Sequence, residues 1–290
     1  MSAPVAVIPA RDEAARIAAA VTPLVAAGLR VVVVANGCAD ETAARARAAG
    51  AAVIETGVLP GGVGEARRVG MAAALEGMPD WVMTTDADCV VARASLAAVA
   101  RRLRVADAVF GRVEPDPGGF AALPARVRRH GMLEDRRDAL RAWIEGLRAA
   151  EPWNPAPCHG QSPGALIALR PSAYRAVGGF APVRCHEDRM IASALARAGL
   201  RVARPWDAVV RASCRLDGRA PGGMADTIGA RAAASFRATL AAETRALRRE
   251  CRDLRHVLET MLGSGAPSAA GVADPSPLTS VPDGTIGLAN

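Results

Sequence analysis

Short apolar runs alternate with helix-like segments along the first hundred residues. The runs cover residues 5–8, 29–37, 51–56 and 81–85, and the second of them, LRVVVVANG, is rich in β-branched residues. Between the first two runs, apolar residues recur at helical spacing, as in Ile17, Val21 and Leu24, and this segment ends at Gly28. Such alternation predicts strand-helix-strand units. We therefore expect an α/β fold with a doubly wound, mostly parallel sheet.

The pattern changes after residue 105. It predicts a strand near residues 108–112, a charged helix over 131–149, a strand over 165–170 and a helix that begins near Glu187. A long basic helix is expected over 224–262, and Gly, Ser, Pro and Ala dominate from there on. We expect one domain over residues 1–215, with halves 1–105 and 106–215. A loop and C-terminal helical extension would follow over 216–262, and a disordered tail over 263–290.

The net charge and the aromatic content of the chain indicate which kinds of ligand the protein binds. The 290 residues carry a formal net charge of +7, which favours a phosphorylated small molecule or an anionic membrane surface as a ligand. Aromatic residues make up only 3% of the chain and are scattered along it. Recognition of single-stranded nucleic acid usually depends on aromatic stacking. We therefore expect no nucleic-acid partner.

Several features favour a cytoplasmic protein. No stretch approaches the roughly 20 apolar residues of a membrane-spanning helix. Charged residues follow the first apolar run, in place of a signal-peptide layout. The six cysteines have no CxxC spacing, which favours reduced thiols. The basic helix over 224–262 has three alternatives: packing on the core, pairing in a homodimer, or peripheral association with the inner face of the membrane. Its scarcity of large aromatic residues favours the first two.

Two aspartates follow the apolar run at residues 81–85, in the segment TTDADCVV. Side chains i and i+2 of a strand point the same way, so Asp86 and Asp88 would present both carboxylates at the carboxyl edge of the sheet. Open α/β sheets bind ligands at that edge. Paired carboxylates suit Mg²⁺ or Mn²⁺ carrying the phosphates of a substrate. The alternative is that both are ordinary turn or helix-capping residues.

A set of ordered motifs points to a family. Neither G-x-G-x-x-G nor a Walker loop follows the first strand. In order, the chain carries VIPARDEAARI, VVVVANGCADET, GGVGEARRVGMAAAL, VMTTDADCVV, GALIALRPSAYRAVGGF and HEDRMIASALARAGLRV. Together these resemble the family 2 glycosyltransferases over about residues 4–205. The resemblance implies the GT-A fold, an α/β fold that binds nucleotide sugars.

Carried over residue by residue, the resemblance also implies a donor site and a catalytic site. The nucleotide-sugar would lie against Pro9, Ala10, Arg11, Glu13, Asn36, Asp40, Gly64, Arg67, Asp86, Ala87 and Asp88. Of these, Asp86 and Asp88 would also hold the metal. Asp188, beside Glu187, would accept the proton of the acceptor hydroxyl. The residues alone leave alternatives open, because Arg67 could belong to a solvated face, and Glu187 and Asp188 could be helix N-terminal acids.

The resulting hypothesis is a metal-dependent, inverting glycosyltransferase that moves one sugar from a nucleotide-diphosphate sugar to an acceptor hydroxyl. The acceptor, a small molecule or a lipid-linked one, stays open. The absence of Q-x-x-R-W after HED argues against a processive synthase. One alternative is a sugar-phosphate nucleotidyltransferase, whose G-x-G-x-R loop is missing here. Another is a non-catalytic nucleotide-sugar-binding pseudoenzyme, which would have no need for Asp86, Asp88 and Asp188 together.

Overall fold

A seven-stranded sheet forms the centre of the computed structural model, which describes residues 2–216, 218 and 224–263. The strand order is β3-β2-β1-β4-β8-β6-β9. In chain order these strands are β1 (Val5–Ala10), β2 (Arg30–Asn36), β3 (Ala52–Thr56), β4 (Val82–Thr84), β6 (Ala108–Phe110), β8 (Ile167–Leu169) and β9 (Val202–Ala203). Strands β3, β2, β1 and β4 are parallel, and only β8 among the seven runs antiparallel to its neighbours. The expected mostly parallel α/β sheet is confirmed.

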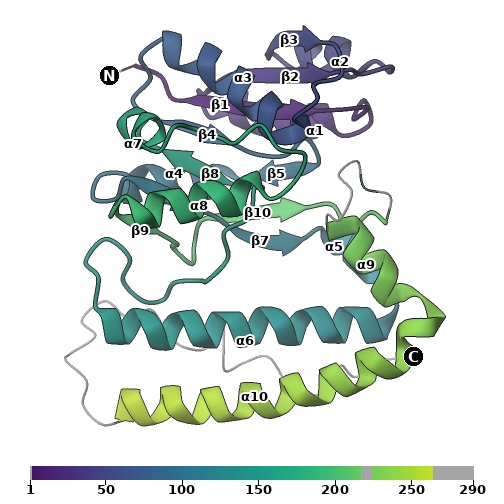
Figure 1. Cartoon of the computed structure of the whole chain (residues 1–290), viewed down its shortest axis with the longest axis vertical. Coiled ribbons are helices and arrows are strands. Elements are labelled where there is room, and N and C mark those ends of the chain that lie inside the picture. Colours follow the sequence, from purple (N-terminus) through teal and green to yellow (C-terminus); the bar gives the residue numbers. More distant parts are fainter. Residues whose placement is uncertain (1, 217, 219–223, 264–290) are drawn as a thin grey trace.

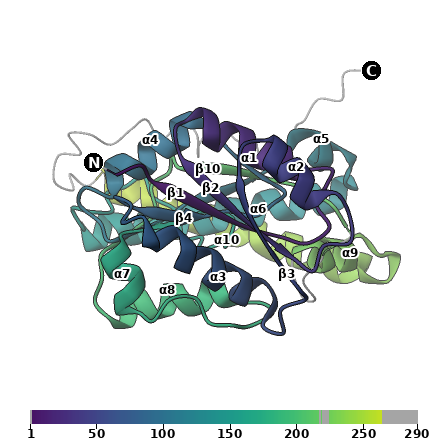
Figure 2. The ribbon, with the colours of Figure 1, turned by 90° about the horizontal axis from the view of Figure 1, so that it is seen from above.

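Helices cover both faces of this sheet, because alternate side chains of β1 and β2 are buried on opposite sides. Ala6 and Ile8 face α1 (Ile17–Ala26) and α4 (Arg93–Arg102), and α2 (Thr42–Ala48) lies beside α1. Val5 and Val7 face α3 (Gly62–Glu76), in a cluster that also takes in α7 (Pro171–Ala176) and α8 (Glu187–Arg197). Figure 2 shows the two helical layers on either side of the strands. The carboxyl ends of the parallel strands are left open for a site.

The structure contains a second, three-stranded sheet that the sequence did not predict. It has the order β5-β10-β7, with β5 (Cys89–Val91), β7 (Arg112–Pro115) and β10 (Val209–Ala212). β5 follows β4 after only four residues, in a stretch that reads as a turn leading into a helix. Strands this short lack enough alternating positions to be recognised from periodicity. The sheet matters because it brings the segment after β10 to the end of β4.

Two long helices lie beside the sheets and run in the same direction (Figure 1). α6 (Ala125–Ala149) follows α5 (Pro117–Ala122), and it begins six residues earlier than predicted, directly after Pro124. α10 (Arg237–Gly263) packs on α6 through a cluster that includes Trp143 and Cys251. Packing against the rest of the chain is thus confirmed for the extension.

The predicted single helix over 224–262 is wrong in one respect. It is divided into α9 (Met224–Ala232), a 3₁₀ turn (Ala234–Phe236) and α10. Ala233 is extended, with φ −60° and ψ 145°, and this break lets Ile228 and Phe236 pack on Leu240. Tertiary packing outweighs helix propensity here. Among the described helices, none combines the length and apolar character that a membrane crossing requires.

Two helical glycines provide a matched test of the packing. A Cβ on Gly70, in α3, would lie 2.3 Å from Val7 Cγ1 and 2.9 Å from Val34 Cγ2, whereas one on Gly131, in α6, would meet nothing within 4 Å. We expect Gly70→Ala to lower the free energy of unfolding by about 1–3 kcal/mol through overpacking. Gly131→Ala should raise it by about 0.5–1 kcal/mol through helix propensity. Urea unfolding measures both, and equal effects would contradict this account of α3.

Candidate active site

Asp86 and Asp88 lie in the turn between β4 and β5, not on a strand as predicted. β4 ends at Thr84, and the backbone N–H of Cys89 closes the turn by donating to the carbonyl of Asp86 at 3.1 Å. Oxygens of both carboxylates and the sulfur of Cys89 nevertheless lie within 4.8 Å of one another. The carboxylates therefore converge because of a tight turn and not because of strand alternation. Ala87 between them is buried.

Arg67 reaches this turn from α3 and is 2% exposed. Its Nη2 donates to Asp86 Oδ1 at 2.5 Å, and Nη1 lies 3.4 Å from Glu187 Oε1. Burial would lower the pKa of Arg67, but attraction by Asp86, Glu187 and Asp188 outweighs burial and raises it. The alternative that Arg67 belongs to a solvated face is wrong. One buried guanidinium instead joins the aspartate turn to the start of α8.

Glu187 and Asp188 begin α8, after His186 in the left-handed region at φ 65°. Glu187 is 4% exposed, and burial raises its pKa, opposed by Arg67. Asp188 accepts hydrogen bonds from the backbone N–H groups of Gly164, at 2.9 Å, and Arg189, at 2.7 Å. The two acids thus differ: Glu187 pairs with the buried arginine, while the half-buried Asp188 is held at the surface of the site.

The β1–α1 and β2–α2 loops are tied to each other beside the aspartate turn. The backbone N–H of Glu13 donates to Thr42 Oγ1 at 2.8 Å, and that of Ala14 donates to Asp40 at 3.0 Å. Burial would raise the pKa of Asp40, but hydrogen bonds from Thr42 and Ala14 outweigh it and lower the pKa. The side chain of Glu13 is buried, whereas Arg11 is exposed. The carboxylate of Glu13 therefore points inward from these loops.

Arg215, from the segment after β10, was not among the predicted site residues. Its Nη1 lies 2.5 Å from Glu13 Oε1 and its Nη2 lies 3.2 Å from Asp88 Oδ2. Burial and repulsion by Asp86 raise the pKa of Asp88, and Arg215 opposes both. The sequence shows only a basic, glycine-rich segment from residue 213 onward, which fits a phosphate-binding loop or a plain linker equally. The ion pairs of Arg215 with Glu13 and Asp88 join residues far apart in the chain, so no local sequence pattern could predict them.

The remaining predicted donor residues have structural partners or buried side chains. Pro9 and Ala10 are buried in β1, so only their backbone faces outward at the strand end. Asn36 is 6% exposed, and its Oδ1 accepts from the backbone N–H of Leu59 at 2.8 Å. Gly64 donates its N–H to the carbonyl of Val183 at 3.1 Å, and a Cβ there would lie 2.2 Å from a backbone oxygen. Gly64 thus allows α3 to approach the segment before α8.

The donor atoms at the turn fit a hard divalent cation. Asp86 and Asp88 supply carboxylate oxygens, the ligand type that Mg²⁺ and Mn²⁺ prefer. Cys89 fits less well, because burial and the neighbouring aspartates raise the pKa of its thiol well above the ordinary value, so the sulfur stays protonated. Two neighbouring carboxylates are the arrangement expected for a cation bound together with the phosphates of a nucleotide.

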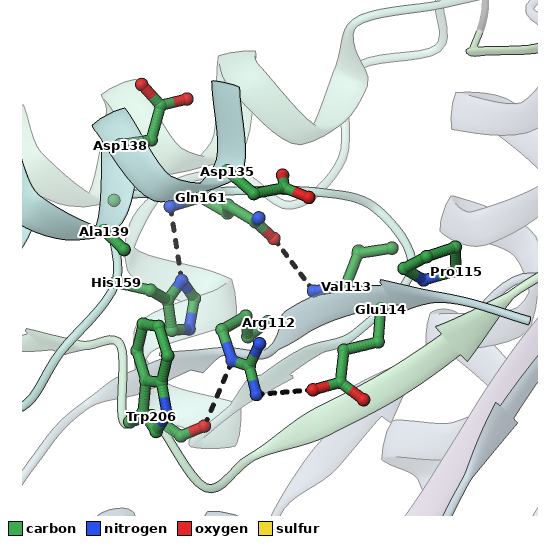
Figure 3. Close-up of a pocket in the computed structure, with 11 residues that line it drawn as sticks. Arg112, Val113, Glu114, Pro115, Asp135, Asp138, Ala139, His159, Gln161 and Trp206 are labelled. Atoms are coloured by element: carbon green, nitrogen blue, oxygen red, sulfur yellow. Dashed lines mark hydrogen bonds and ion pairs between the residues drawn. The ribbon is translucent and has the colours of Figure 1, made fainter. Parts of the chain in front are cut away.

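A small cavity of about 60 Å³ lies between β7, α6 and the loop over 159–161 (Figure 3). His159 is one of the residues that line it. Its Nε2 donates to the carbonyl of Phe110, and its Nδ1 accepts from the backbone N–H of Gln161. Burial lowers the pKa of His159 to about 3. Arg112 lies over Trp206 at 4.2 Å and pairs with Glu114 at 2.7 Å. The histidine is therefore neutral, and the polar groups here are mostly acceptors.

Asp135 stands at the edge of this cavity, on α6 (Figure 3). Partial loss of hydration and repulsion from Asp138 and Glu134 raise its pKa to about 6, although the residue as a whole is exposed and water screens part of this effect. The cavity also borders the loop that continues to Gly164, whose N–H holds Asp188. The cavity is therefore connected through one short segment to the acidic start of α8.

Comparison with solved structures shows the fold. The chain aligns with a fragment of S. aureus TarS in complex with UDP at 16% identity and a TM-score of 0.52, covering 73% of this chain and 61% of that fragment. It aligns with glucosyl-3-phosphoglycerate synthase from Mycobacterium tuberculosis in complex with phosphoglyceric acid at 21% identity and a TM-score of 0.50, covering 92% and 82%. A mycobacterial protein shares 25% identity at a TM-score of 0.47, and the chain spans 65% of its length. The GT-A fold is confirmed.

Sequence comparison adds the family. No curated protein sequence matches the chain. The sequence model of glycosyl transferase family 2 matches residues 5–150, which include β1 to β7, Arg67 and the Asp86–Asp88 turn. The chain therefore belongs to glycosyl transferase family 2 and is a transferase.

Proposed function

We propose that this chain is a metal-dependent, inverting enzyme that transfers one sugar from a nucleotide-diphosphate sugar to an acceptor hydroxyl. The observation that carries the proposal is the buried Arg67, which joins the Asp86–Asp88 turn to Glu187 and Asp188. A donor at the turn and an acceptor beside α8 would meet across this arginine. TarS, which shares the fold, was crystallised in complex with UDP, and this favours a nucleotide ligand for this chain as well.

The donor side would stabilise the leaving diphosphate. Asp86 and Asp88 would hold Mg²⁺ or Mn²⁺, which supplies positive charge to the diphosphate as the glycosidic bond breaks. Glu13, on the loop after β1, would face the ribose or base, with Asp40 holding that loop through Ala14. The charge of Arg67 is already fixed by its carboxylates, so it needs no reorganisation during the reaction.

The acceptor side would activate a hydroxyl. Asp188 is half-buried, and the N–H groups of Gly164 and Arg189 orient its carboxylate. A positioned carboxylate that takes the proton of a hydroxyl as it attacks typically contributes 10²–10⁴-fold in rate. Attack from the face opposite the leaving diphosphate inverts the anomeric carbon. Glu187 pairs with Arg67 and would act by positioning it.

We place the acceptor toward the cavity in Figure 3. Glu114, Asp135 and Asp138 line it with carboxylates, against Arg112. This charge balance disfavours an anionic acceptor and favours a neutral one rich in hydroxyls, whose O–H groups donate to carboxylates. A second function, nucleotidyl transfer, has no feature of the described residues in its favour.

The donor site is tested by thermal shift with UDP-, GDP- and dTDP-sugars, each with Mn²⁺ or with EDTA. We expect one nucleotide class to stabilise the protein with Mn²⁺, by about 2.7 kcal/mol at a ligand concentration 100 times Kd. Asp88→Asn should abolish this shift, because it removes a cation ligand. Asp207→Asn, which alters an exposed ion pair with Arg101, is the control and should keep it. Lack of stabilisation by every nucleotide would exclude the donor site.

The catalytic base is tested by Asp188→Asn. We expect turnover to fall about 10²–10⁴-fold. Donor affinity, measured by calorimetry, should stay within about twofold, because Asp188 contacts Gly164 and Arg189 and not the aspartate turn. Glu187→Gln should differ by also lowering thermal stability, since it leaves Arg67 with less compensating charge. A loss of donor affinity that matches the loss of turnover would contradict the role of Asp188.

Asp135 gives a pH prediction. Its folded pKa of about 6 lies above the ordinary value of 3.8, so the folded state binds the proton more tightly than the unfolded state. Ionisation of Asp135 therefore costs stability as pH rises from about 4 to about 6, and the cost is constant above that. Asp135→Asn should be more stable than wild type at pH 7.5, by about 1 kcal/mol after solvent screening, and equal to it near pH 4. Carboxyl NMR of Asp135 should show a midpoint near pH 6, and a midpoint near 4 would refute the assignment.

A further inference from the structure

Arg215 contacts one of the two carboxylates that the proposed donor site would offer to its cation. The guanidinium contacts Asp88, one of the two cation ligands, and Glu13, the residue proposed to face the nucleoside. Arg215 is 14% exposed at its side chain, and Glu13 is 4% exposed, so this pairing is shielded from water. Shielded pairs between a guanidinium and a carboxylate are stronger than surface pairs. Arg215 therefore occupies Oδ2 of Asp88, one of the two oxygens that this carboxylate could offer to a cation.

Arg215 is the arginine that pairs with Asp88, because the nearby Arg67 is paired with Asp86. Asp86 is already paired with Arg67 at 2.5 Å, so Arg67 leaves Asp88 to another partner. The backbone N–H of Ser213 donates to the carbonyl of Asp88 at 3.2 Å, and this bond anchors the segment that carries Arg215 beside the turn. Asp86 and Glu13 both repel Asp88. Without Arg215, Asp86 would keep Arg67 and Glu13 would keep the more exposed Arg16 at 3.7 Å, but Asp88 would lose its guanidinium partner.

We propose that Arg215 is an internal counter-cation that competes with the divalent metal for Asp88 and is transferred to the donor diphosphate when the nucleotide binds. This inference rests on the proposed donor site. In the nucleotide-free protein, Arg215 neutralises Asp88 and keeps metal affinity low. A nucleoside diphosphate offers Arg215 a stronger anionic partner, and Asp88 then becomes available as a ligand. Metal and nucleotide would therefore bind with positive cooperativity.

The proposal is tested by titrating the protein with Mn²⁺ in the absence of any nucleotide. The electron paramagnetic resonance signal of free Mn²⁺ reports how much of the metal is bound. We expect Arg215→Ala to bind Mn²⁺ about tenfold more tightly than wild type, because Asp88 loses its competitor. Arg215→Gln, which keeps a polar hydrogen-bonding side chain without the charge, should do the same and guards against loss of folding. Arg211→Ala removes an equal charge from an exposed position on β10 and is the matched control, with unchanged affinity.

A second titration measures UDP affinity by calorimetry in the presence of saturating Mn²⁺. Arg215→Ala and Arg215→Gln should weaken UDP binding about tenfold, while Arg215→Lys should restore part of it. Equal Mn²⁺ affinity in wild type and both variants, or no Mn²⁺ binding by the variants, would overturn the competition. Tighter Mn²⁺ binding by the variants together with unchanged UDP affinity would overturn the transfer to the diphosphate. Failure of UDP to bind wild type at all would instead count against the proposed function. In that case the nucleotide-free Mn²⁺ titration would still test whether Arg215 competes with the metal for Asp88.

Discussion

The burial of Arg67 is the constraint on which the site depends. A guanidinium removed from water is stable only if carboxylates surround it, and Asp86 and Glu187 do so from two parts of the fold. Removing one partner of such a buried pair costs roughly 3–5 kcal/mol. α3, the aspartate turn and the start of α8 are therefore held in one arrangement. On the proposed function, the reacting groups would inherit their geometry from this requirement and not from the loops that carry them.

Close backbone approach makes the arrangement possible. A Cβ on Gly164 would lie 2.5 Å from the guanidinium of Arg67, and one on Gly64 would lie 2.2 Å from the carbonyl oxygen of Ala181. Neither glycine has an unusual φ, so both are required by space and not by backbone conformation. The N–H of Gly164 is then free to hold Asp188. Small residues thus set the distance between α3 and the segments that carry Gly164 and the start of α8.

The sequence predicted the parallel half of the sheet well, because β1 and β2 are long β-branched runs buried on both faces. It predicted Asp86 beside Asp88 from their spacing, but Glu187 and Arg67 joined the same predicted site only through family resemblance. It could not show that Arg67 is buried, because helical spacing does not distinguish a buried arginine from a solvated one. Nor could it identify Arg215, whose partners lie some 200 and 130 positions away along the chain. Such long-range ion pairs leave no periodic pattern.

Charge balance supports the proposal that the site takes a cation, although the chain is basic overall. Five carboxylates gather at the site, from Glu13, Asp86, Asp88, Glu187 and Asp188. Two shielded arginines, Arg67 and Arg215, face them, and the more exposed Arg16 lies 3.7 Å from Glu13. The raised pKa values of Asp88 and Glu187 show that burial and this crowding are only partly compensated. On the proposed function, a diphosphate would bring further negative charge to this site. A divalent cation that arrived with it would offset the added charge, and the proposed release of Arg215 toward the phosphates would offset the rest.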